Sequence, residues 1–325
     1  DMLGDLYTVP IEGGEATALT EGVAWDFQPR FSPDGTQVAF VSDRGGADNI
    51  WVVAADGSEA RAVTEEKTNL VHNPSWSPDG EYIVAKKGFT STRSIPAGEI
   101  WMFHLGGGGG LQLTERPHGN QDQKTMAEPS FSIDGRYVYY SQDVTAGRVW
   151  QYNKDSTGSI FAIKRLERDT GKTDTFIAGA GGAIRPTPSP DGRMLAFVKR
   201  TPAFTSALYV KDLETGVERA VYEQLDRDLQ ETNGSQGNAP AFAWTPDSKS
   251  LVFWAGGKIR RVAAGGGEAQ VIPVHIRAEK QVTPALRFAV DVAPDDLQVK
   301  MLRWAQASPD GKTVVFQALG HLYSK

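Results

Sequence analysis

Short apolar runs alternate with compact polar turns along the whole chain. The turn reads Ser-Pro-Asp-Gly at residues 32–35, 77–80, 189–192 and 308–311, with variant copies at 132–135 and 245–248. Ser first, Pro second and Gly fourth are the preferences of a type I turn. Each copy is followed by an apolar run of three to five residues, such as Val38–Val41. The pattern predicts a β-hairpin at every copy.

A second repeat follows these hairpins. It begins as Asn49–Val53 and continues as Arg61–Thr64, and related copies start near residues 99, 207 and 256. The aspartates of successive turns are 45, 55, 57, 56 and 63 residues apart. A period of this size with four short strands per unit is typical of a β-propeller. We therefore expect an all-β fold of four-stranded antiparallel blades, six-bladed or seven-bladed with one blade incomplete.

The two ends of the chain carry unpaired copies of the outer strand, at Gly4–Pro10 and Gly320–Lys325. We expect residues 1–325 to form a single propeller domain that is cut in mid-blade at both ends. The alternative is a closed ring, in which Glu15–Thr20 supplies the missing strand of the last blade.

Composition narrows the possible partners. The formal net charge is −6 and the sequence has no basic block, which argues against a nucleic-acid partner. No apolar run is long enough to predict a membrane span. Cysteine is absent, which is compatible with an oxidising compartment.

The sequence offers no catalytic set. None of its five histidines forms a metal-binding pair, and the repeated aspartates lie inside turns that need them. Gly234–Gly237 misses the spacing of a nucleophile elbow, and the run Gly106–Gly110 fails the dinucleotide pattern. We expect no catalytic residue, metal or cofactor in this chain. Whether the chain is part of an enzyme stays open.

Polar residues recur where each inner strand begins. The residue six positions before each turn aspartate is Gln28, Asn73, Glu128, Arg185, Ala241 or Trp304. Inner strands surround the channel of a propeller, so these side chains predict a polar channel rim. The full predicted binding rim is Gln28, His72, Asn73, Glu128, Arg185, Arg303 and Trp304. The alternative is simple solvation of strand ends.

Three segments exceed the repeat: residues 141–159, 223–238 and 274–302. Long insertions in a compact fold are usually functional or disordered. The second is highly polar, and we expect it to be a mobile loop.

Phe31–Gly35, Ile50–Val52 and Ala62–Thr64 together resemble the repeat of TolB-type propellers. That resemblance implies a bacterial periplasmic or secreted protein. Residues 4–14, 282–288, 300–304 and 320–323 resemble, more narrowly, the amino-terminal propeller of bacterial amidohydrolase fusion proteins. The metal-dependent barrel of those proteins is not in this sequence.

We therefore expect a non-catalytic module that binds a protein partner or an adjacent domain of its own polypeptide, or that gates substrate for a larger amidohydrolase-like hydrolase. A peptide or small polar ligand at the channel mouth would fit the rim. The alternatives are a stand-alone periplasmic TolB-like protein-binding propeller and a hydrolase with its own site in the channel.

Overall fold

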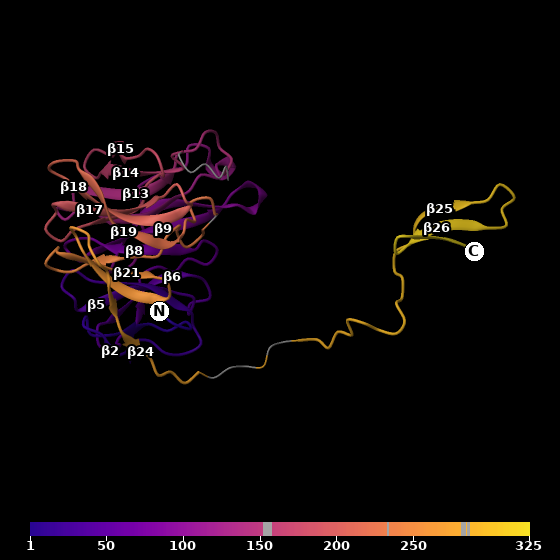
Figure 1. Ribbon diagram of the computed structural model, residues 1–325, viewed down its shortest axis with the longest axis horizontal. Coiled ribbons are helices and arrows are strands. Elements are labelled where there is room, and N and C mark those ends of the chain that lie inside the picture. The colour runs from indigo at the N-terminus through magenta and orange to yellow at the C-terminus, as the bar shows by residue number, and fades with distance from the viewer. Residues whose placement is uncertain (152–157, 233, 281–283, 285–286) are drawn as a thin grey trace. The chain divides into compact units, whose positions relative to one another are not determined.

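The computed structural model describes residues 1–151, 158–232, 234–280, 284 and 287–325. It divides the chain into two compact units, Asp1–Arg277 and Ala278–Lys325. The described residues form strands and turns with two short 3₁₀ turns, at Thr92–Ser94 and Gly119–Gln121 (Figure 1). The predicted all-β fold is confirmed. No helix in this part of the chain is long and apolar enough to cross a membrane.

The first unit contains five four-stranded antiparallel sheets, each built from strands consecutive in the chain. They are β4 (Asp26–Phe31), β5 (Gln37–Ser42), β6 (Asn49–Ala54) and β7 (Arg61–Ala62); β8 (Val71–Trp76), β9 (Tyr82–Thr90), β10 (Pro96–His104) and β11 (Leu111–Gln112); β12 (Met126–Phe131), β13 (Tyr137–Asp143), β14 (Phe161–Glu167) and β15 (Thr173–Ile177); β16 (Ile184–Pro188), β17 (Met194–Arg200), β18 (Thr205–Asp212) and β19 (Glu218–Arg227); and β20 (Ala243–Trp244), β21 (Ser250–Ala255), β22 (Lys258–Ala263) and β23 (Gln270–Ile272).

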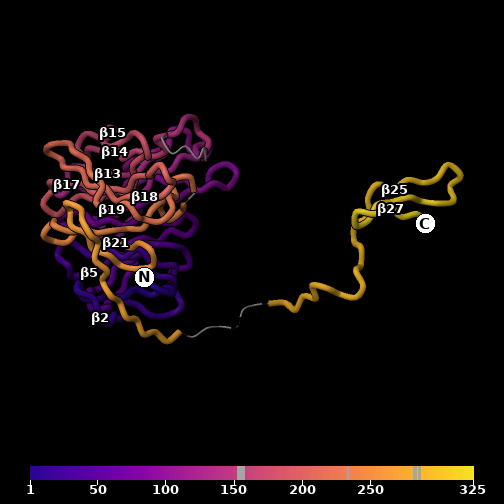
Figure 2. The backbone as a smooth tube through the Cα atoms, viewed as in Figure 1, coloured from indigo at the N-terminus to yellow at the C-terminus, as the bar shows by residue number. Residues whose placement is uncertain are grey.

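The first strands of neighbouring sheets contact one another, β4 with β8, β8 with β12 and β12 with β16. The sheets are therefore blades whose first strands surround a common axis. In Figure 2 the colour of the tube changes gradually from one blade to the next along the chain. Segment 223–238 was predicted to be a mobile loop, and that prediction is wrong for its first part, because β19 continues to Arg227.

The remaining strands lie near the ends of the two units. β1 (Tyr7–Thr8) pairs with β3 (Thr17–Ala18), and β2 (Gly14–Glu15) pairs in parallel with β24 (Val274–His275), joining both ends of the first unit (Figure 1). The second unit holds one antiparallel sheet of β25 (Arg303–Ala307), β26 (Val314–Ala318) and β27 (His321–Ser324). The blade number and the single domain over residues 1–325 stay predictions.

The turn motif is held by its own side chains. Ser77 Oγ donates to Asp79 Oδ1 at 2.5 Å and accepts the backbone N–H of Tyr82 at 2.9 Å. The bond from Ser77, followed by that from the Glu81 N–H, lowers the pKa of Asp79. The same Ser- or Thr-to-Asp bond recurs in the other five copies. The turn aspartates thus stabilise hairpins.

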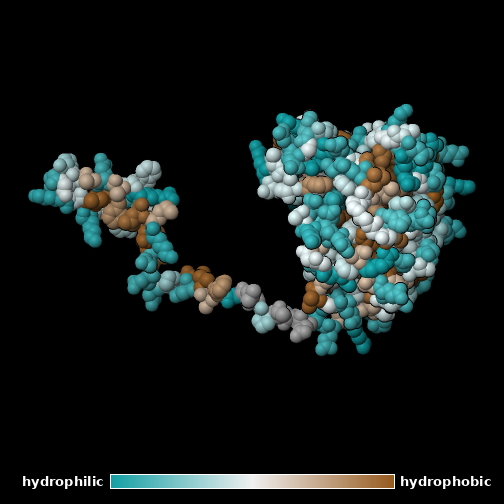
Figure 3. Space-filling model, turned by 180° about the vertical axis from the view of Figure 1, so that it is seen from behind, coloured by the Kyte–Doolittle hydropathy of each residue, from teal (hydrophilic) through white to brown (hydrophobic). Residues whose placement is uncertain are grey.

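Apolar side chains fill the spaces between blades. Phe40, Phe103, Phe161 and Phe197 are fully buried, one in each of the first four blades. The surface seen in Figure 3 is mostly hydrophilic with scattered apolar side chains. The core therefore lies between blade faces, which leaves the central axis to polar groups.

Candidate functional site

The first strand of each of the first four blades carries the same backbone irregularity. The ladder to the second strand shifts register between Phe27 and Arg30 in β4, and at the equivalent positions of β8, β12 and β16. Within each shift lies a non-glycine residue with φ of +56°: Gln28, Asn73, Glu128 and Arg185. Left-handed backbone at such residues costs about 1–3 kcal/mol each and is often found at functional sites.

These four irregularities sit at polar positions that the sequence had singled out. A proline follows each of the four residues, at 29, 74, 129 and 186. Since a residue before proline is ordinarily extended, local preference alone does not produce this conformation. The surrounding blades must hold it.

Four of the predicted rim residues converge on one segment of the same chain. We call residues 234–239 the tip segment, and Gln28, Asn73, Lys86, Glu128 and Arg185 the channel ring. Gln28 Nε2 and Asn73 Nδ2 donate to the carbonyl of Gln236, at 2.7 and 2.9 Å. Lys86 Nζ donates to the carbonyl of Ser235 at 2.9 Å.

Glu128 binds the other end of the tip segment. Its Oε1 accepts the backbone N–H groups of Asn238 and Ala239, at 2.7 and 3.3 Å. The same oxygen lies 3.2 Å from the guanidinium of Arg185. Among the described residues, each bond from the ring to the tip segment therefore ends on a backbone atom of that segment.

Gly237 occupies the centre of the ring. A β-carbon there would lie 2.7 Å from Arg185 Nη2, 2.9 Å from Glu128 Oε1 and 3.2 Å from Asn73 Nδ2. Its φ of +104° also suits glycine. Backbone and ring approach so closely here that any side chain would displace one or the other.

Burial gives the channel ring unusual electrostatics. The side chain of Glu128 is fully buried and that of Arg185 is 6% exposed. Burial lowers the pKa of Lys86 to about 8, and the charge of Glu128 partly opposes that change. Burying these charged groups would cost much free energy if they did not pair with one another and with the tip segment.

A second buried cluster anchors the base of the loop that carries the tip segment. Arg200 pairs with Asp228 at 2.8 Å, and Gln230 Nε2 donates to the carbonyl of Gly181 at 2.9 Å. All three side chains lie among the buried residues. The loop therefore leaves the fourth blade at a fixed point and reaches the axis from there.

The remaining rim predictions fall elsewhere. His72 is buried between the first two blades, where its ring contacts Phe27 and its Nε2 lies 2.8 Å from Asp48. Arg303 and Trp304 lie in the second unit, where both residues are exposed, and their place in the rim stays a prediction. For His72, the prediction of a rim position is wrong, because its side chain points into the blade interface.

Sequence reasoning missed Lys86 and the tip segment. Lys86 directly follows the apolar run of β9. A lysine at such a buried position needs a partner, and this could have marked it as a candidate site residue. The Gly234–Gly237 stretch lacks the spacing of a nucleophile elbow and lies in the polar insertion 223–238, whose composition predicts a mobile loop. Lys86 donates to the backbone carbonyl of Ser235, and within the described part of the chain no hydrogen bond reaches the Ser235 hydroxyl.

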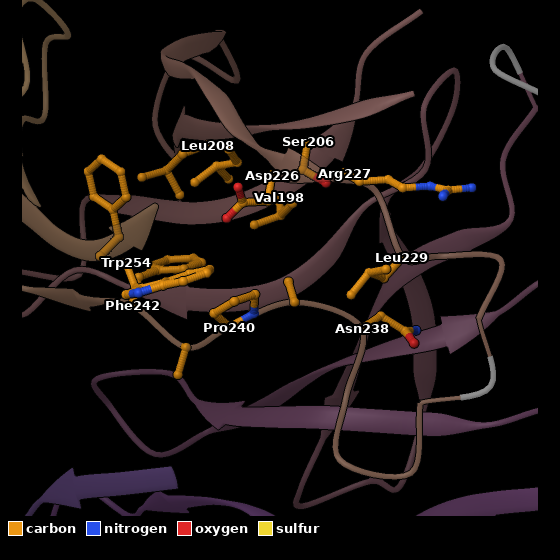
Figure 4. A pocket seen from close by; sticks show the side chains of 14 residues that line it. Val198, Ser206, Leu208, Asp226, Arg227, Leu229, Asn238, Pro240, Phe242 and Trp254 are labelled. Atoms are coloured by element: carbon orange, nitrogen blue, oxygen red, sulfur yellow. The ribbon is translucent and has the colours of Figure 1, made fainter. Parts of the chain in front are cut away.

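An apolar cavity of about 300 Å³ borders the loop on the side of the fourth and fifth blades. Leu208, Leu225 and Phe242 line it, and Figure 4 shows Asn238 and Pro240 along its edge. The loop just after the tip segment is therefore not closely packed on that side.

No group of three or more potential metal ligands occurs among the residues that the structure describes. The expectation that this chain holds no metal or cofactor stays a prediction.

Comparison with known proteins agrees with the blade architecture. Residues 2–159 match a family model described as the TolB beta propeller domain. TolB from Acinetobacter baumannii superposes with a TM-score of 0.60 at 17% identity, covering 83% of this chain and 62% of that one. The fold is a TolB-like β-propeller. The putative TolB from Agrobacterium tumefaciens gives a TM-score of 0.56 at 20% identity, covering 75% and 80% of the two chains.

Two sequence relatives each match this chain over part of their own length. The uncharacterized peptidase YuxL of Bacillus subtilis is 28% identical, with the match covering 43% of this chain and 25% of that protein. The uncharacterized protein Atu1656 of Agrobacterium fabrum is 32% identical, covering 43% and 48%. The TolB-like propeller thus matches half or less of either relative.

Proposed function

We propose that this TolB-like propeller is a protein-interaction module whose channel ring binds a short stretch of polypeptide backbone. One observation carries the proposal: within the described residues, the bonds that ring side chains from the first three blades make to the tip segment all end on its carbonyl and N–H groups. Backbone groups are common to all peptides. A segment from a partner or an adjacent domain can therefore take the same place.

Exchange of the tip segment is physically reasonable. The side chain of Gln236 is exposed, and the loop beyond the tip segment borders the apolar cavity. Few packed apolar groups would be lost on withdrawal, so local opening should need much less free energy than unfolding. The ring itself would remain supported by the blades.

The test uses the chain's own sequence as the probe. A fluorescein-labelled peptide of residues 232–240 is titrated with the wild-type chain and with the Gly237→Ala variant, whose added β-carbon should expel the tip segment. We expect the variant to bind at least tenfold more tightly, because its ring is vacant.

Two results decide the matter. Adding Asn73→Ala to Gly237→Ala should abolish peptide binding, since the ring then loses a donor to the peptide backbone. Equal affinity of wild type and Gly237→Ala, or binding that survives Asn73→Ala unchanged, would refute a backbone-binding ring. Circular dichroism would show that each variant remains folded.

We further propose that the propeller is an accessory module of a larger periplasmic hydrolase of the amidohydrolase type. In support, one relative is named a peptidase, and the matches cover only part of the relatives. The mass of the native protein, measured in periplasmic and cytoplasmic fractions, tests this. A native mass near 35.2 kDa, the mass of this chain, would contradict it.

A further inference from the structure

One residue of the tip segment joins the channel ring to the apolar cavity. The backbone N–H of Ala239 donates to Glu128 Oε1 at 3.3 Å. Its methyl group packs against the core cluster that contains Leu208 and Phe242, and both of these residues line the cavity. Ala239 itself also lines it. The ring thus fixes the backbone at a point where the side chain faces the cavity.

The cavity has more room than this alanine uses. Its volume is about 300 Å³, whereas an engineered cavity of about 150 Å³ already holds benzene. Figure 4 shows Trp254 and Phe242 at one end of it and Leu229 and Asn238 at the other. Other parts of the wall, such as Leu225 on β19 and Trp254 on β21, belong to the blades. These walls would therefore remain if another peptide replaced the tip segment.

The position two residues earlier has the opposite requirement. A β-carbon on Gly237 would lie 2.7 Å from Arg185 Nη2, and the φ of +104° there also suits glycine. A segment that takes the place of the tip segment in the same conformation therefore needs glycine at this position. The side chain of Gln236 is exposed, so the residue before that glycine is less restricted.

We infer that the partner segment of the ring carries glycine and, two residues later, a leucine- or phenylalanine-sized apolar side chain that fills the cavity. The inference rests on the proposed function and adds a side-chain preference to a ring that contacts backbone atoms. Burying the larger side chain stabilises the complex in proportion to the apolar area removed from water. The chain's own Ala239 leaves that area unused, so a partner can displace the tip segment.

The experiment titrates labelled peptides of residues 232–240 into the Gly237→Ala chain. A peptide carrying Ala239→Leu should bind at least tenfold more tightly than the unchanged peptide. A peptide carrying Gln236→Leu is the matched control and should show no gain, because that side chain is exposed. Equal gains from both leucine peptides would overturn the inference. Exposed Asp226 also lines the cavity, so tighter binding of an Ala239→Lys peptide would overturn the assignment to an apolar side chain.

A second measurement needs no added peptide. In the intact chain, Ala239→Leu should slow amide hydrogen exchange at Asn238 at least tenfold, because a side chain held in the cavity keeps that N–H on Glu128. Gln236→Leu should leave this exchange unchanged, and Ala239→Met serves if Ala239→Leu proves unstable. Unchanged exchange in both variants at position 239 would overturn the pocket. If no peptide binds, the proposed function fails, whereas slowed exchange at Asn238 would still support a side-chain pocket.

Discussion

Glu128 is bonded twice to Arg185 across the interface between the third and fourth blades. Its Oε2 accepts the Arg185 backbone N–H at 2.9 Å, and its Oε1 lies 3.2 Å from the Arg185 guanidinium. Oε1 also accepts the N–H of Asn238. One carboxylate therefore links the packing of two blades to the position of the tip segment.

The first prediction follows from that carboxylate. Glu128→Ala should lower the free energy of unfolding by about 3–5 kcal/mol, because removing one partner leaves the Arg185 charge buried and unpaired. Urea unfolding measures the change. Glu167→Ala is the control: its partner Arg136 is 55% exposed, so little change is expected. Similar losses in both variants would contradict this account.

The second prediction concerns access to the loop. Gly237→Ala should increase cleavage within residues 229–240 by proteinase K at least tenfold, because the added β-carbon collides with Arg185 and Glu128. Gly107→Ala is a matched control, since φ is +97° there and a β-carbon would meet nothing within 4 Å. If Gly107→Ala increased cleavage around its own position by the same factor, backbone strain alone would explain the effect of Gly237→Ala.

The third prediction is a dependence of stability on pH. The pKa of Lys86 falls from 10.5 to about 8 in the folded chain, so between these values the unfolded state binds a proton that the folded state lacks. The contribution of Lys86 to the unfolding free energy must then rise as the pH rises from about 8 to 10.5. Wild type should gain stability relative to Lys86→Met over this range, measured by urea unfolding at successive pH values. A constant difference would disprove the lowered pKa.

The fourth prediction tests the turn motif. Ser77→Ala should lower the unfolding free energy by about 1–2 kcal/mol, since the buried hydroxyl makes two hydrogen bonds inside its turn. Ser58→Ala removes an exposed hydroxyl from an outer hairpin and should have little effect. Thermal unfolding of both variants, with the peptide titration as a second readout, separates a structural role from a binding role. Lost peptide binding at unchanged stability would place Ser77 in a site.

Counting along the repeat also predicted where ring residues would stand. The position six residues before each turn aspartate lies at the same point of the first strand in each of the first four blades. Gln28, Asn73, Glu128 and Arg185 were found in this way, and they converge because first strands surround one axis. His72, one position earlier, faces the blade interface instead, because successive side chains of a strand point in opposite directions.

The sequence by itself determined the hairpins, the order of the blades and the polar first-strand positions, since each depends on a few neighbouring residues and on a period. Only the tertiary structure decided what occupies the channel. Glu128 meets Asn238 across 110 residues, and Lys86 meets the carbonyl of Ser235 across 149. No local preference encodes such contacts. They arise because the blades bring distant strands to one axis. A charge or backbone group buried there without a partner would raise the free energy of the folded state.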